Sequence, residues 1–125
     1  MKRVISTTSA PAAVGPYSQA IEANGTLYVS GQIPLDPATG ECAVGIEAQT
    51  TRALDNVKAI LTEAGYELKD VVKATVLLDN IDDFAAMNAI YSTYFTENMP
   101  ARACYEVARL PLGVMVEIEV IAVKA

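Results

Sequence analysis

The chain has 125 residues, of which 52% are apolar, and its formal net charge is −6. Fifteen acidic residues outnumber nine basic ones. Because lysine and arginine supply most of the affinity for phosphate, we do not expect nucleic acid as a partner. The chain has no histidine, which excludes serine–histidine and cysteine–histidine nucleophile pairs and imidazole metal ligands.

The apolar content is high for a small domain, and the mean hydropathy is +0.27. Exposed apolar patches commonly mark interfaces, so we expect an oligomer. No apolar run reaches the roughly 18 residues of a membrane-spanning helix, and the charged start lacks the apolar stretch of a signal peptide. We therefore expect a cytoplasmic protein without a membrane partner, in which Cys42 and Cys104 stay reduced.

Three strands are predicted ahead of the first helix. An irregular Ser/Thr/Ala/Pro loop follows the first of them. Asn24 and Gly25 lie between the second and third, and this pair is a strong signal for a two-residue hairpin. Within the third strand, Thr26, Tyr28, Ser30 and Gln32 are expected on one polar side. The three strands cover residues 2–5, 18–23 and 26–33.

Residues 46–64 predict an amphipathic helix. Apolar side chains fall on one stripe, whereas Arg52, Asn56 and Glu63 lie away from it. Gly65 follows in the position of a C-terminal cap. The apolar stripe consists of Ile46, Ala53, Leu54, Val57, Leu61 and Ala64.

The second half of the chain predicts three strands and one helix. The helix begins after an acidic, Asn-containing segment, ends near Phe95 and has an apolar stripe of Phe84, Met87, Tyr91 and Tyr94. The strands cover residues 71–78, 101–107 and 114–123. The order β-β-β-α-β-α-β-β over a single domain, residues 1–125, favours an α+β fold whose mixed sheet has two helices on one face.

The last strand has two unlike faces. Its even-numbered residues, 114–122, are apolar and suit a core, because side chains alternate with a period of two. Its odd-numbered residues are mostly apolar but include Glu117 and Glu119. A wet sheet face should be more polar than this, so burial against another subunit explains the mixture.

Two charged residues are the strongest candidates for chemistry. Arg102 shares one face of its strand with Cys104 and is either part of a surface ion pair or a clamp for a carboxylate. Glu117 lies among apolar neighbours and is either paired with a basic residue or acts as a general acid–base. Cys104 is expected to be a small buried side chain without a base to activate it.

Further candidates have equally plain structural alternatives. Tyr17 and Ser30 are residue types that often make structural hydrogen bonds. Gly31 permits a close approach, either of a ligand or of packed groups. Asn88 lies on the inward stripe of its helix, where it either ties down a loop or meets a ligand.

Several segments together resemble the RidA (YjgF) family. They are GPYSQA at 15–20, VSGQIP at 29–34, QTT at 49–51 leading into LDNV at 54–57, MNAIY at 87–91, PARAC at 100–104 and VEIEVIA at 116–122. The resemblance covers nearly the whole chain in register. It implies a chorismate-mutase-like α+β fold assembled as a homotrimer with three clefts between subunits.

The resemblance also implies an activity, the cofactor-independent hydrolysis of enamines and imines such as 2-aminoacrylate and 2-iminobutanoate to 2-ketoacids and ammonia. Arg102 would hold the substrate carboxylate, and Glu117 would orient water and shuttle protons. The substrate-binding set would be Tyr17, Ser30, Gly31, Asn88, Arg102 and Cys104, with no metal. Two alternatives stay open: a trimer that binds 2-ketoacids as a sensor, and an endoribonuclease or translation inhibitor, against which the acidic charge and missing histidine argue.

Overall fold

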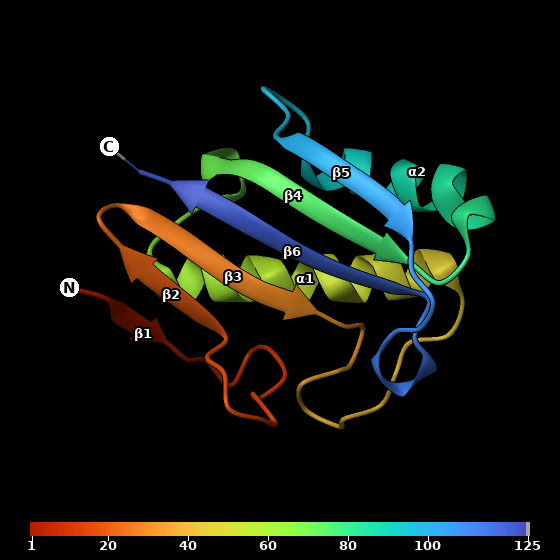
Figure 1. Ribbon diagram of the computed structural model, residues 1–125, viewed down its shortest axis with the longest axis horizontal. Helices are drawn as coiled ribbons and strands as arrows, with labels where there is room; N and C mark the ends of the chain where they lie inside the picture. Colours follow the sequence, from red (N-terminus) through yellow and green to blue (C-terminus); the bar gives the residue numbers. More distant parts are fainter. Residues whose placement is uncertain (125) are drawn as a thin grey trace.

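The computed structural model describes residues 1–124, and the two long helices cover one face of a six-stranded sheet (Figure 1). The sheet order is β1-β2-β3-β6-β4-β5, with only β4 and β5 parallel. The mixed sheet predicted from the sequence is therefore confirmed. The elements are β1 (Arg3–Ile5), β2 (Ala20–Ala23), β3 (Thr26–Gln32), α1 (Ile46–Ala64), η1 (Leu68–Asp70), β4 (Val71–Leu78), η2 (Ile81–Asp83), α2 (Phe84–Tyr94), β5 (Ala101–Glu106), η3 (Pro111–Gly113) and β6 (Val116–Val123).

The turns and caps form where the sequence places them. Asn24 and Gly25 both have positive φ, 52° and 75°, as a two-residue hairpin turn requires. Helix α1 begins and ends at the predicted residues, and Gly65 closes it in the left-handed conformation with φ 84°. Strands β2 and β6 each begin two residues later than predicted, at Ala20 and Val116.

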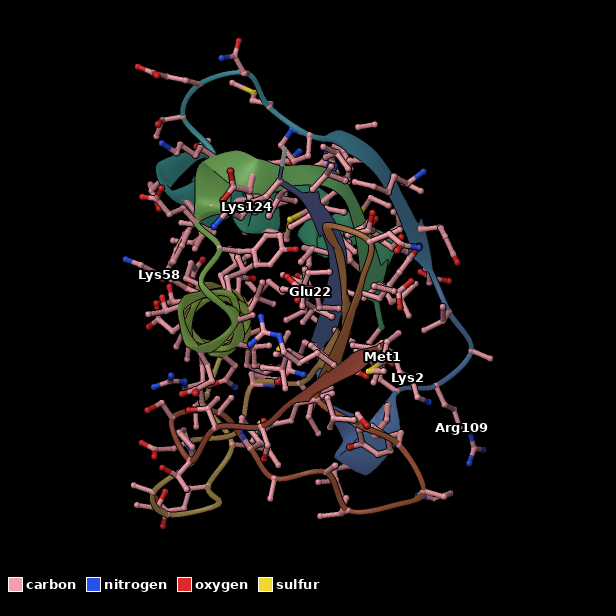
Figure 2. The ribbon with its side chains drawn as sticks, turned by 90° about the vertical axis from the view of Figure 1, so that its left-hand side faces the viewer. Met1, Lys2, Glu22, Lys58, Arg109 and Lys124 are labelled. Carbon is pink, nitrogen blue, oxygen red and sulfur yellow. The ribbon has the colours of Figure 1, made fainter. Side chains whose placement is uncertain are left out.

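The core lies between the sheet and the helices. The even-numbered residues of β6, with Val114 just ahead of them, are buried, as are all six residues of the predicted α1 stripe. Seen down the axis of α1, the helix lies to one side of the sheet (Figure 2). None of the helices in residues 1–124 is long and apolar enough to cross a membrane.

Two helix residues differ from the predicted pattern. Asn56, expected away from the apolar stripe, is 0% exposed. Its Nδ2 donates to the backbone oxygens of Ile33 and Leu35, at 3.1 and 3.0 Å, because α1 also packs against the segment that follows β3. Phe84, expected in the core, is 38% exposed, while Phe95 just after α2 is buried instead.

Strand β3 contains a bulge that the sequence analysis missed. Val29 lies opposite Val120 and Gln32 opposite Ile118, so a step of three residues in β3 spans only two in β6. The extra residue reverses the alternation. Gln32 is consequently buried on the helix face, and the predicted common polar side with Thr26 and Tyr28 is wrong at this position.

The second face of the sheet has no helix over it in residues 1–124 (Figure 1). Tyr28 and Ile121 lie opposite one another there, and Thr75 lies opposite Glu119. Tyr28, Tyr105 and Val123 are among the large apolar side chains left exposed. We call this surface the bare face. The alternation of side chains in the last strand predicts this apolar face.

Candidate functional site

Arg102 lies on the edge strand β5 with its side chain on the helix face. Arg102 lies opposite Ala74 of β4, and Ala74 lies opposite the core residue Val120 of β6. Side chains of residues that lie opposite one another on neighbouring strands are on the same face of the sheet. The guanidinium carbon is 4.7 Å from the centroid of the Tyr91 ring, and Nη1 donates a 2.7 Å hydrogen bond to Asn88 Oδ1. Helix α2 therefore fixes the orientation of the guanidinium by stacking and by one hydrogen bond.

Arg102 has no acidic partner among residues 1–124. The ion pairs in that range are Arg3–Glu22 and Lys69–Glu67, so within these residues Arg102 does not form the surface ion pair of the alternative interpretation. A guanidinium has five N–H donors, and one of them reaches Asn88. The others are free to bind an anion from outside the chain.

A hollow of about 350 Å³ lies beside the guanidinium. Its lining includes Asn88, Tyr91, Met99 and Arg102, so polar and apolar groups converge there. Cys104 is two residues further along the same face of β5. Burial raises the pKa of its thiol, and Arg102 offsets this only in part, so the thiol stays protonated at neutral pH. The sequence prediction that Cys104 is a weak nucleophile fits this environment.

Glu117 lies on the bare face, opposite Leu77 of β4. Burial raises the pKa of its carboxyl, and the nearby charge of Glu119 raises it further. Within residues 1–124 the carboxylate has no hydrogen bond from another side chain and no ion pair, so the predicted structural alternative of a basic partner is wrong within the chain. A partly buried carboxyl with a raised pKa is a candidate for proton transfer.

Gly31 makes room for that carboxylate. A Cβ at this position would overlap Glu117 Oε2 and lie 2.9 Å from the carboxyl carbon. Of the two close approaches that the sequence leaves open at Gly31, the structure contains the packed one, with Glu117 against the backbone of the β3 bulge. Glu117 and Gly31 therefore form one unit.

Tyr17 lies in the loop ahead of β2, and Ser30 lies in the bulge of β3. The Ser30 hydroxyl donates to the backbone oxygen of Ser18 at 2.6 Å, and the Ser30 N–H donates to Gln19 O at 2.9 Å. These bonds attach the Tyr17 loop to the strand. Tyr17 itself is 52% exposed, which leaves its ring available to a ligand or a second chain.

Gln19 holds the same loop and was not identified from the sequence. It is 4% exposed. Its Nε2 donates to the backbone oxygens of Thr7, Ala10 and Pro11, at 3.1, 3.3 and 2.8 Å, and its Oε1 accepts from Thr7 N at 2.7 Å. The available signal was a polar side chain at the end of a long loop that has no regular backbone pairing of its own.

The candidate residues form two groups on opposite faces of the sheet. Arg102, Asn88 and Cys104 lie on the helix face, whereas Glu117 and Gly31 lie on the bare face. The sheet itself separates Arg102 from Glu117, so one chain does not bring them into one cleft. We call the first group the arginine half and the second, with Tyr17 and Ser30, the glutamate half.

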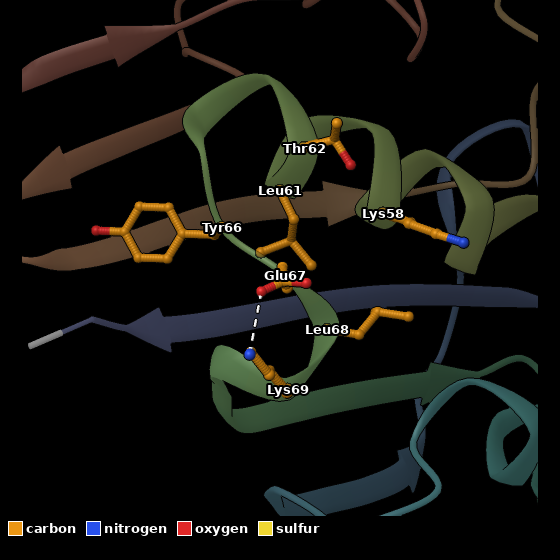
Figure 3. Close-up of a pocket in the computed structure, with 7 residues that line it drawn as sticks. All are labelled: Lys58, Leu61, Thr62, Tyr66, Glu67, Leu68 and Lys69. Carbon is orange, nitrogen blue, oxygen red and sulfur yellow. Dashed lines mark ion pairs between the residues drawn. The ribbon is translucent and has the colours of Figure 1, made fainter.

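Of the other hollows in residues 1–124, one of about 440 Å³ has Tyr17 in its lining, and three contain none of the predicted site residues. The one in Figure 3, about 320 Å³, lies at the end of α1 between Lys58, Tyr66 and Lys69. Its dashed ion pair joins Lys69 and Glu67 over 3.3 Å, and both side chains are exposed. In the described part of the chain, no three His, Cys, Asp or Glu residues gather as a metal site would require.

A mixed sheet with two helices on one face places the chain in the class of small α+β proteins. Residues 7–124 match the family model described as Endoribonuclease L-PSP. The chain belongs to this family, which contains the RidA and YjgF proteins, so the resemblance found in the sequence is confirmed.

Named relatives and solved structures agree with that assignment. The 2-iminobutanoate/2-iminopropanoate deaminase of Mus musculus is 51% identical, over 99% of this chain and 93% of its own length. A putative endoribonuclease from Thermotoga maritima has a TM-score of 0.98 and 52% identity, covering 100% of this chain and 99% of its own. The YjgF gene product of Escherichia coli gives 0.95 and 48%, covering 98% and 99%. The predicted fold class is confirmed by these matches.

Proposed function

We propose that the protein hydrolyses small imines and enamines that carry a carboxylate, such as 2-iminobutanoate and 2-aminoacrylate, to 2-ketoacids and ammonia. The observation that carries this proposal is the guanidinium of Arg102, oriented by Asn88 and Tyr91 and without an acidic partner in residues 1–124. A planar guanidinium matches a carboxylate in two-point fashion. The deaminase name carried by a relative 51% identical supports the same reading.

The working site is a cleft between two copies of the chain, in a homotrimer with three such clefts. The arginine half and the glutamate half lie on opposite faces of one sheet, so a second copy is the simplest way to join them. The exposed apolar side chains of the bare face support burial against that copy. A head-to-tail contact of unlike surfaces closes into a ring, as a trimer requires.

Within that cleft, Arg102 holds the carboxylate while Glu117 manages the protons. Water adds to the imine carbon as Glu117 accepts one of its protons, and the electrons of the C=N bond move to nitrogen, which becomes protonated. Glu117, having returned its first proton to the nitrogen, takes the hydroxyl proton of this adduct and passes it to the amino group. The C–N bond then breaks, and ammonia leaves as the carbonyl forms. An enamine first takes a proton at carbon to become the imine. Burial raises the pKa of the Glu117 carboxyl, which favours its exchange of protons with water and substrate.

The remaining candidates complete the pocket. Tyr17 and Ser30 approach from the glutamate half, and Asn88 and Cys104 from the arginine half. Imines of this type hydrolyse unaided, so only modest acceleration is needed, and orientation of water and substrate by these groups supplies it. No cofactor takes part in the proposed steps.

The test is turnover of 2-aminoacrylate and 2-iminobutanoate, generated enzymatically and measured side by side. The proposal requires ammonia and 2-ketoacid to appear in equal amounts, faster than in the same mixture without the protein. A matched control is Lys58→Ala, since Lys58 is exposed on α1 and belongs to neither half. If a 2-ketoacid binds but neither imine is hydrolysed faster, the protein is a ligand sensor instead.

A further inference from the structure

Tyr91 carries a buried polar atom without a partner. Among the buried side-chain nitrogen and oxygen atoms of residues 1–124, only its hydroxyl lacks a hydrogen bond. The residue is 6% exposed. Buried hydroxyls in proteins nearly always have a partner, whether from the protein, a water or a ligand. This hydroxyl therefore indicates a group that comes from outside the chain.

The position of Tyr91 indicates which group that is. Its ring stacks against the Arg102 guanidinium at 4.7 Å, and it lines the hollow of about 350 Å³ together with Asn88 and Arg102. Asn88 and Tyr91 are three residues apart on α2, so both side chains lie on one face of the helix. The Tyr91 side chain thus lines the same hollow as the guanidinium that is free to bind an anion.

The electrostatics make this hydroxyl a donor. Burial raises the pKa of Tyr91, with Cys104 acting in the same direction and Arg102 opposing it. The net direction is upward, so the hydroxyl stays protonated at neutral pH. A carboxylate has about four acceptor positions, so a guanidinium that occupies two of them leaves room for a further donor.

We propose that the Tyr91 hydroxyl donates a hydrogen bond to the carboxylate that Arg102 holds, and that Tyr91 is a binding residue for carboxylate ligands. The inference rests on the proposed function for the identity of the ligand. It assigns two contributions to one side chain: the ring orients the guanidinium, and the hydroxyl contacts the ligand.

The test compares Tyr91→Phe with Tyr94→Phe, a matched change on the same helix. Tyr91→Phe keeps the ring under Arg102 and removes only the hydroxyl. The Tyr94 hydroxyl, in contrast, already donates to Asp55 Oδ1 at 2.6 Å. The measurements are the thermal midpoint of each ligand-free protein, the affinity for 2-oxobutanoate by calorimetry, and kcat and KM for the imine.

Tyr91→Phe should leave the ligand-free midpoint unchanged or raised, because an unpartnered buried hydroxyl adds no stability. Its affinity for 2-oxobutanoate should fall on the order of tenfold, as for the loss of a hydrogen bond to a charged group. KM should rise with kcat little changed. Tyr94→Phe should show the reverse pattern, a lower midpoint and unchanged affinity.

Unchanged affinity in Tyr91→Phe would overturn the inference, because the hydroxyl then meets no more than water. A lower midpoint in Tyr91→Phe would overturn it as well, since the hydroxyl would have a structural partner. These failures differ from failure of the proposed function. If the wild-type protein binds 2-oxobutanoate and Arg102→Lys does not, the carboxylate site is correct whatever the effect of Tyr91→Phe. If the wild-type protein neither binds 2-oxobutanoate nor hydrolyses an imine, the proposed function itself fails.

Discussion

The guanidinium of Arg102 is oriented before any ligand arrives. It is held by the 2.7 Å bond to Asn88 and by the face of Tyr91, with the Phe84 ring 5.5 Å away. A lysine at this position would keep the charge but lose the planar fork and its stacking. Arg102 thus differs from Arg3, whose guanidinium is paired with Glu22, because Arg102 is oriented by an uncharged side chain and an aromatic ring.

Arg102→Lys should therefore weaken 2-oxobutanoate binding by about 10- to 150-fold, which corresponds to about 1.5–3 kcal/mol for a charge-assisted hydrogen bond. The measurement is calorimetric affinity together with kcat/KM for the imine. Arg109→Lys, an exposed substitution outside both halves, serves as the control. A change of less than twofold in Arg102→Lys would remove the carboxylate clamp from the account.

Glu117→Gln should separate chemistry from binding. The amide keeps the shape of the side chain against Gly31 but cannot accept a proton from water. We expect kcat to fall by about 100-fold or more, typical of losing a general acid–base, with 2-oxobutanoate affinity nearly unchanged. Full turnover in this variant would end the acid–base role of Glu117.

Glu119 should tune Glu117 without replacing it. Its charge raises the pKa of the Glu117 carboxyl, in addition to the larger effect of burial. In Glu119→Gln the pKa of Glu117 should fall, so the acidic limb of the kcat/KM profile should move to lower pH, because the ionised form that accepts the proton persists further into acid. A limb that stays in place or moves to higher pH would mean that another group titrates.

At the scale of elements, the bulge in β3 positions the glutamate half. It turns Gly31 toward Glu117 and buries Gln32 on the other face. Gly31 has no positive φ, so its need for glycine is a matter of space for the carboxylate and not of backbone strain. The bulge thereby couples the backbone of β3 to the position of the Glu117 carboxylate on the neighbouring strand β6.

Gly31→Ala should fold but lose turnover, because the new Cβ must displace the Glu117 carboxylate. The check is a double-mutant cycle on kcat with Glu117→Gln. Once the proton acceptor is gone, adding Gly31→Ala should lower kcat little further. Independent, additive losses would show that Gly31 acts apart from Glu117.

Much of this architecture was predictable from the sequence. The ends of α1 follow from its apolar period and from Gly65, and the hairpin follows from Asn24-Gly25. The bulge was not predictable, since period-two alternation gives no sign of an extra residue and Gln32 was assigned to the wrong face. Asn56 was predicted to be exposed because the periodicity of the helix gives no sign of the loop that its side chain supports.

The candidate site was predictable residue by residue but not as an arrangement. Alternation within β5 and β6 puts Arg102 with Cys104 and separates Glu117 from its even-numbered neighbours. Only the pairing of both strands with β4 shows that Arg102 and Glu117 point to opposite faces. Gln19 and the unpartnered hydroxyl of Tyr91 depend on tertiary contacts, which no local pattern records.

At the scale of the whole molecule, the two opposite faces predict that each cleft contains groups from two chains. The exposed apolar side chains of the bare face favour the same assembly. In a ring of identical subunits, every arginine half then meets the glutamate half of a neighbour. A chain with an inactivating substitution in its arginine half should therefore be complemented by a chain with an inactivating substitution in its glutamate half.

The direct test is the activity of mixed oligomers made from Arg102→Met and Glu117→Gln chains, each inactive alone. Random mixing in equal amounts should restore about one quarter of wild-type activity, since about one cleft in four then joins two intact halves. The mixed preparation should sediment as a trimer. No recovered activity in a well-mixed trimer, or a stable monomer at micromolar concentration with full wild-type turnover, would contradict a cleft built from Arg102 of one chain and Glu117 of another.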